Sequence, residues 1–161
     1  LLGAKDYGPA VDMWSVGCIL VELHTGRVAF AGKSELEQLH LIYGVRGTPS
    51  ADCKSLTSLP EFQNMKPKKN YKPCLKEHLH KMNPNSTIAP ETFDLISKLL
   101  ELDPTKRLTA HEALEHDYFY KGILPCKPDQ IPKFSESCHE LEAKKRRLER
   151  DEIMQQKKKY K

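Results

Sequence analysis

The stretch that decides the fold spans residues 11–24 and reads VDMWSVGCILVELH. Its apolar side chains fall on nearly every side of a helix, which is typical of a helix buried in the middle of a domain. Pro9 fits the first helical turn, Asp12 places a carboxylate near the positive end, and Gly26 is a C-terminal stop signal. We therefore expect these residues to form the central helix of a helical domain.

Three further body helices are predicted, each by a start residue followed by an apolar stripe. Residues 50–88, which follow the first of them, hold four prolines and predict an irregular insert with short helical turns. No segment shows the alternation of a strand, so the predicted fold class is all-α. The three helices are expected to begin at Ser34, Pro90 and Thr109 and to end near Gly47, Leu102 and His116.

The composition bounds the class of protein. The 161 residues are 39% hydrophobic and 30% charged, which excludes a collagen-like, disulfide-scaffold or wholly disordered chain. No apolar run approaches the ~18 residues of a membrane helix and no secretory signal is visible, so we expect no membrane partner. The five cysteines are odd in number and form no C-x-x-C pair, which favours reduced thiols and an intracellular protein.

The net charge of +4 is concentrated at the C-terminal end. Residues 139–161 hold nine Lys or Arg and five Asp or Glu, whereas the rest of the chain holds seventeen of each sign. A neutral body argues against a large nucleic-acid surface, so nucleic acid is expected only at the tail. We divide the chain into a helical domain at 1–120, an extended linker at 121–135 and a basic helical tail at 136–161.

Two near-matches to chemical motifs fail on spacing. His111 and His116 lie five residues apart, about 140° around a helix, whereas a zinc-protease helix needs a spacing of four. Residues 26–34 resemble a phosphate-binding loop, but five residues separate the glycines and a helix precedes them. We expect no metal site and no nucleotide loop here.

Three blocks resemble, in order and spacing, the large lobe of eukaryotic protein kinases. Residues 12–19 (DMWSVGCI) are similar to the D-x-W-S-x-G-x-x pattern of its central helix, and residues 102–110 (LDPTKRLTA) to L-D-P-x-x-R-x-T-A. Residues 113–119 (ALEHDYF) resemble the following A-L-x-H-x-x-F. The resemblance implies that residues 1–120 form a partial kinase domain, the second half of the large lobe.

The insert narrows this resemblance to the cyclin-dependent kinase group. Residues 59–71 (LPEFQNMKPKKNY) resemble the transcription-elongation members, which phosphorylate the repeat tail of RNA polymerase II. Residues 138–147 (CHELEAKKRR) are similar to their extension helix. The resemblance implies a cyclin and a protein with Ser-Pro sites as partners, ATP and Mg²⁺ as cofactors of the intact family member, and a nuclear location.

The resemblance also implies roles for four residues. The kinase Asp that matches Asp12 accepts hydrogen bonds from the catalytic loop, and a simple helix-start carboxylate is the alternative. Arg107 matches the Arg that pairs with the Glu of A-P-E, so we expect an uncompensated guanidinium and a less stable fragment, or else a surface Arg beside Asp103. Trp14 is expected to be a large core anchor, and Gly17 to permit close approach of another helix.

The tail has three interpretations. The resemblance implies that His139 and Glu140 lie near the nucleotide-binding region. Alternatively, the basic cluster is a nuclear-localisation or nucleic-acid patch, or it is simply a solvated charged helix. The cluster consists of Lys144, Lys145, Arg146 and Arg147.

The catalytic equipment of a kinase is missing from these 161 residues. The Gly-rich loop, the ATP-anchoring Lys, H-R-D, D-F-G and the A-P-E that closes the activation segment before the central helix are absent, and the letters A-P-E at residues 89–91 instead open a later predicted helix. We therefore expect no catalytic residue and no cofactor in this chain, and no activity when it is alone. The alternatives are a non-catalytic helical interaction module, such as a truncated kinase-like scaffold, and a nucleic-acid-binding helical protein that uses the tail.

Overall fold

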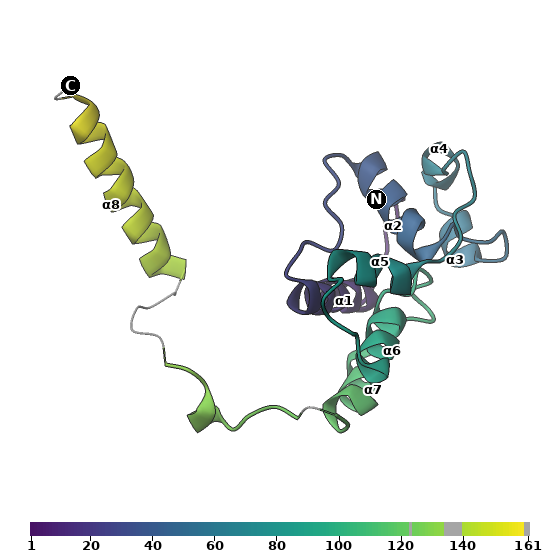
Figure 1. The fold of residues 1–161 in the computed structure, drawn as a ribbon. Coiled ribbons are helices and arrows are strands. Elements are labelled where there is room, and N and C mark those ends of the chain that lie inside the picture. The colour runs from purple at the N-terminus through teal and green to yellow at the C-terminus, as the bar shows by residue number, and fades with distance from the viewer. Residues whose placement is uncertain (123, 134–139, 160–161) are drawn as a thin grey trace. The chain divides into compact units, whose positions relative to one another are not determined.

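The computed structural model describes residues 1–122, 124–133 and 140–159, in two compact units, Leu1–Leu124 and Pro125–Lys161. Every regular element among the described residues is helical, which confirms the predicted all-α class. The first unit contains α1 (Ala10–Thr25), α2 (Glu35–Arg46), α3 (Lys54–Thr57), α4 (Phe62–Met65), α5 (Leu75–Met82), α6 (Pro90–Leu99), α7 (Ala110–Leu114) and the 3-10 turn η1 (Asp117–Phe119) (Figure 1).

The predicted helix ends are close to the observed ones. Pro9 precedes α1, and Gly26 ends it in the left-handed region, with its N–H donating to the Glu22 carbonyl. The Ser34 hydroxyl accepts from the Glu37 N–H at the start of α2, but the Glu37 carboxylate accepts from the Lys33 N–H instead of closing a capping box. Such caps satisfy backbone groups that the first helical turn leaves without partners.

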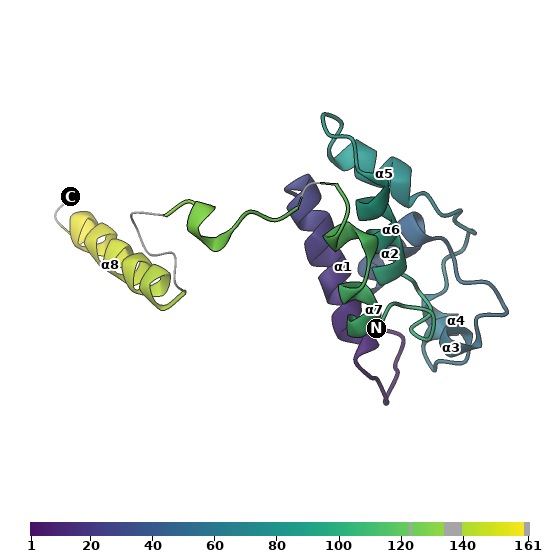
Figure 2. The ribbon, with the colours of Figure 1, turned by 90° about the horizontal axis from the view of Figure 1, so that it is seen from below.

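The α1 helix packs against α6, and this contact forms the middle of the first unit (Figures 1 and 2). Gly17 lies where the two helices cross: a Cβ placed on it would come within 2.8 Å of Leu100 Cδ2 and 3.0 Å of Leu99 Cβ. Both leucines are fully buried, as is Ile96. The absence of a side chain at position 17 therefore sets how closely the helices approach.

The prediction that α1 is buried on every side is wrong for this chain. Its buried residues are Met13, Gly17, Val21 and Thr25, a single stripe of i, i+4 spacing. On another side of the helix, Val16, Ile19 and Leu23 are 45%, 56% and 79% exposed. The helix carries more apolar surface than the described residues cover.

The insert differs from the prediction in one element. The short helices α3 and α4 correspond to the expected helical turns, but residues 75–82 form the regular helix α5, which buries Leu75 and Leu79 in the main core. Thr48 and Tyr71 close the base of the insert, because the Thr48 N–H donates to the Tyr71 carbonyl and the Tyr71 N–H donates to the Thr48 hydroxyl.

Two later helices are shorter than expected. The α6 helix ends at Leu99 rather than Leu102, and α7 ends at Leu114 rather than His116. Thr109, the predicted helix start, forms a complete capping box with Glu112 at the beginning of α7. Between α6 and α7 the chain forms a turn that is held by hydrogen bonds of the Asp103 and Arg107 side chains.

The second unit contains the 3-10 turn η2 (Pro128–Gln130) and the long helix α8 (Glu140–Lys159). The predicted tail helix was expected to extend through residues 136–161, of which 136–139 and 160–161 lie outside the described residues. Among the helices that the structure describes, none is both long enough and apolar enough to cross a membrane.

Candidate functional site

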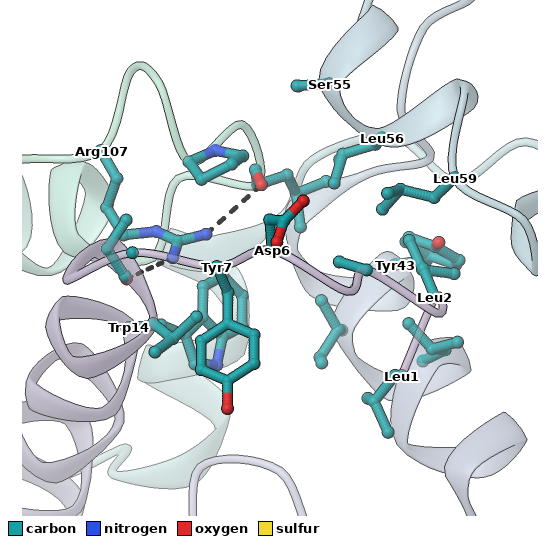
Figure 3. Close-up of a pocket in the computed structure, with 18 residues that line it drawn as sticks. Leu1, Leu2, Asp6, Tyr7, Trp14, Tyr43, Ser55, Leu56, Leu59 and Arg107 are labelled. Atoms are coloured by element: carbon teal, nitrogen blue, oxygen red, sulfur yellow. Dashed lines mark hydrogen bonds between the residues drawn. The ribbon is translucent and has the colours of Figure 1, made fainter.

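A pocket of about 410 Å³ lies among the chain start, α1, α2, α3 and the turn after α6. Figure 3 shows Arg107 and Trp14 on one side of it, and Leu2, Tyr43 and Leu59 on the other. Two of the signature segments, residues 12–19 within α1 and residues 102–110 after α6, therefore meet at this pocket.

Arg107 is the most heavily bonded side chain of this pocket. Its guanidinium donates to the backbone carbonyls of Ala10, Glu101 and Leu102, at 2.7 Å and 2.9 Å for the two bonds to Glu101. Burial lowers the pKa of Arg107, and the nearby charges of Glu101 and Asp103 oppose that shift. The predicted uncompensated guanidinium is thus hydrogen-bonded to backbone oxygens, which ties the start of α1 to the turn after α6.

The Trp14 ring packs against the guanidinium of Arg107. The Arg107 Cζ lies 5.1 Å from the centre of the Trp14 ring, a cation–π contact of the kind that contributes about 1 kcal/mol. The same ring stacks on the ring of Phe30, with 5.9 Å between the two ring centres. Trp14 is only half-buried among the described residues, so it forms the wall of the pocket and the edge of the core.

Asp103 holds the insert against the body. Its Oδ1 accepts hydrogen bonds from the Ser55 hydroxyl at 2.8 Å and from the N–H and hydroxyl of Thr105 at 3.1 Å and 2.8 Å. Burial acts to raise the pKa of Asp103, but the bonds from Thr105 and Ser55 outweigh it and leave that pKa below its usual range. The sequence gives no signal for Ser55, because the Asp–x–Thr spacing indicates the turn but not the partner from the insert.

Tyr43 brings a polar atom to the apolar side of the pocket. The residue is 1% exposed, and its hydroxyl has no hydrogen-bond partner among the described residues. Burial raises the pKa of this phenol. Tyr43 could not be recognised from the sequence, because an aromatic residue at an apolar helix position predicts only core packing.

The other predicted residues lie elsewhere. Asp12 is exposed in the first turn of α1 and does not line the pocket. His139 lies outside the described residues, and Glu140 begins α8, where its side chain is not described. The predicted basic cluster lies on α8 in the second unit; Lys144, Lys145 and Arg147 are exposed, and the Arg146 Nε donates to the Glu142 carbonyl.

No group of three His, Cys, Asp or Glu side chains lies together in the part of the chain that the structure describes. The guanidinium of Arg107 is already occupied by carbonyl oxygens.

Comparison with known proteins identifies the architecture. The protein kinase domain family matches residues 1–119. Cyclin-dependent kinase C-1 of Oryza sativa subsp. japonica is 43% identical over 148 residues, and cyclin-dependent kinase G1 of Arabidopsis thaliana is 43% identical over 136. These alignments cover 91% and 83% of this chain but only 27% and 22% of the relatives.

A solved structure gives the same result. One chain of the yeast RNA Pol II CTD kinase CTDK-1 complex superposes with a TM-score of 0.67 at 36% identity, covering 77% of this chain and 40% of that one. The chain therefore belongs to the protein kinase domain family. Within that family it belongs to the cyclin-dependent group, as the sequence motifs predicted, and it spans about a quarter of the length of the curated relatives.

Proposed function

We propose that this chain is the C-terminal part of the large lobe of a cyclin-dependent-type Ser/Thr kinase, and that it supports phosphoryl transfer without performing it alone. The observation that carries the proposal is a stripe on α1 formed by Asp12, Val16, Ile19 and Leu23, which we call the open stripe. Its members follow each other at helical spacing and all are exposed. A carboxylate thus heads an apolar surface that the rest of the lobe can cover.

The physical chemistry of the open stripe fits this role. Covering its three apolar side chains would stabilise the lobe by roughly 1 kcal/mol each. The Asp12 carboxylate, which has no side-chain partner in the described part of the chain, is placed to accept backbone N–H bonds from whatever covers the stripe. In kinases the matching Asp holds the catalytic loop in this manner, so Asp12 is a positioning residue in the proposed parent protein.

The proposal extends to the parent protein's reaction. That protein would transfer the γ-phosphate of ATP, with Mg²⁺, to Ser in Ser-Pro sites such as the RNA polymerase II repeat tail, in the nucleus and with a cyclin partner. Support comes from the cyclin-dependent relatives and from the yeast RNA Pol II CTD kinase complex. The chain itself would bind neither cofactor and would be inactive alone.

The tail receives a separate proposal. We infer that the exposed basic residues of α8 act as a nuclear-localisation signal, while His139 and Glu140 approach the nucleotide region of the parent lobe. Changing Lys144, Lys145 and Arg147 to Ala in a fluorescent fusion should redistribute the protein to the cytoplasm. Unchanged nuclear fluorescence would contradict the nuclear-localisation role. Salt-dependent nucleic-acid binding that is lost when residues 139–161 are deleted would instead support a nucleic-acid-binding role for the tail.

The first experiment is to read the coding sequence upstream of Leu1. In-frame H-R-D, D-F-G and A-P-E motifs are expected. A stop codon with a local start would overturn the proposal and favour the non-catalytic interaction module. Phosphate transfer from ATP by the purified 161-residue chain would contradict the predicted inactivity.

A second experiment tests the role of Asp12 in the protein encoded by the complete transcript. Asp12→Asn should lower kcat by about tenfold or more with little change in KM, because a charge-assisted hydrogen bond to the catalytic loop is weakened. Asp52→Asn is the matched control, since Asp52 is an exposed carboxylate of the insert. Equal effects of the two substitutions would show that Asp12 has no special role.

A further inference from the structure

The pocket of about 410 Å³ around Arg107 is called the Arg107 pocket below. A second cavity, of about 320 Å³, lies between the last turn of α1, the helix α5 and the loop that leads to α6. We call it the α1–α5 cavity. None of its lining residues also lines the Arg107 pocket, and none belongs to the motifs that identify the family. Its polar lining residues are His24, Lys76, His80, Ser86 and Thr87.

The charge of this lining is of one sign. It contains a lysine, two histidines and two hydroxyl groups, and no carboxylate lines the cavity. Lys76 and His80 are four residues apart on α5, so their side chains project from the same side of that helix. In the part of the chain that the structure describes, none of the five polar side chains forms a hydrogen bond or an ion pair with another residue, so all five are available to a ligand.

The backbone around the cavity is fixed. The Asn83 Nδ2 donates to the His24 carbonyl at 3.0 Å, which ties the loop after α5 to the end of α1, and the Ser86 N–H donates to the Asn83 carbonyl. Leu79, which is 1% exposed, and the half-buried Ile88 supply an apolar part of the wall. The cavity thus combines cationic and hydroxyl donors with a small apolar surface.

We propose that the α1–α5 cavity binds a phosphomonoester group, presented either by a phosphorylated Ser or Thr of a protein or by a small metabolite. A phosphomonoester is a compact anion with several acceptor oxygens, which Lys, protonated His and hydroxyl groups satisfy together. The cavity lies at the small end of the range of ligand pockets, so it accommodates the phosphoryl group and a few carbon atoms against Leu79 and Ile88. The inference does not depend on the proposed kinase function.

The test is a titration of the ¹⁵N-labelled 161-residue chain with phenyl phosphate, followed by NMR. Saturable shifts of the amide signals of His24 and of the residues other than Pro84 between 76 and 88 are expected. Lys76→Ala should weaken binding about tenfold, because one charge-assisted hydrogen bond is lost, and His80→Gln should weaken it as well. Lys81→Ala is the matched control: Lys81 carries the same charge on the same helix but does not line the cavity, so it should change affinity less than twofold.

Two further titrations distinguish the sources of the group. A phosphoserine pentapeptide that binds more tightly than phenyl phosphate would identify a phosphoprotein ligand, and the reverse order a metabolite; the unphosphorylated peptide should not bind. Shifts that do not saturate, or an equal loss of affinity with Lys81→Ala and Lys76→Ala, would overturn the proposal, because the binding would then reflect general positive charge. A spectrum without dispersed signals, both with and without phenyl phosphate, would also overturn it for this chain.

Discussion

Two faces of the same helix have opposite surroundings. On one face of α1, Gly17 lies against Leu99 and Leu100 without room for a methyl group, whereas on the open stripe Ile19 and Leu23 are mostly exposed. Both faces are apolar in sequence. The apolar sequence of a helix reflects the surface that the helix buries against all of its partners. The contacts within this chain cover only one part of that surface.

The largest expected effect tests this contrast directly. Ile96 is fully buried on α6 and Ile19 is 56% exposed on α1. Ile96→Ala should lower the free energy of unfolding by about 2–5 kcal/mol through lost burial and a cavity, whereas Ile19→Ala should change it by less than about 0.5 kcal/mol. Urea unfolding of both variants of the 161-residue chain checks this. A comparable loss in both would mean that the open stripe is covered in solution.

The insert is attached differently from α1. The α1–α6 contact is apolar, whereas the insert is held by hydrogen bonds to the Asp103 carboxylate. Asp103→Ala should lower the free energy of unfolding by about 2 kcal/mol, because the donors of Ser55 and Thr105 lose a charged acceptor. Asp52→Ala, at an exposed position of the insert, is the control with little expected effect.

The pH dependence of this attachment has a defined sign. The pKa of Asp103 in the folded chain lies below its usual range, so its stabilising contribution is present above about pH 4 and is lost as the pH falls through the folded pKa. The gap in unfolding free energy between wild type and Asp103→Ala should therefore narrow as the pH falls below 4. A gap that stays constant down to pH 2 would show that the charge of Asp103 contributes nothing.

A smaller effect is expected at the helix crossing. Gly17→Ala gains about 1 kcal/mol of helix propensity but forces Leu100 and Leu99 to move, so a net loss of roughly 1 kcal/mol is expected. Gly44→Ala is the matched control: Gly44 lies inside α2, no neighbouring atom lies within 4 Å of a Cβ added there, and the substitution should stabilise the chain. Thermal unfolding midpoints should move in opposite directions, and a gain for both variants would mean that the crossing is loosely packed.

The sequence predicted the helices better than the tertiary contacts between them. Pro9, Gly26, Ser34 and Thr109 act locally, through backbone dihedrals and caps, so the helix limits that depend on them are close to the observed ones. The helix α5 was missed, although Leu75, Leu79 and Met82 have helical spacing, because the prolines on either side indicated an irregular insert.

The candidate site was predictable only in part. The motifs selected Trp14 and Arg107, which do meet, but the pairing of Ser55 with Asp103 joins positions 48 residues apart. Local patterns carry no information about such a contact, since it depends on how the insert folds back. The same holds for the α1–α5 cavity, whose lining comes from three separate segments.

The smallest effect concerns the pocket beside α1. The Tyr43 hydroxyl is buried without a partner in the described part of the chain, and such a group carries a desolvation cost of about 1–3 kcal/mol. Tyr43→Phe removes the hydroxyl and keeps the ring, so stability should stay unchanged or rise by up to about 1 kcal/mol, since a small void partly offsets the gain. Tyr71→Phe, at a half-buried position of the insert, is the control. A loss of stability above 1 kcal/mol in Tyr43→Phe alone would show that the hydroxyl is satisfied in solution, and the water or ligand atom that satisfies it would then lie inside the Arg107 pocket.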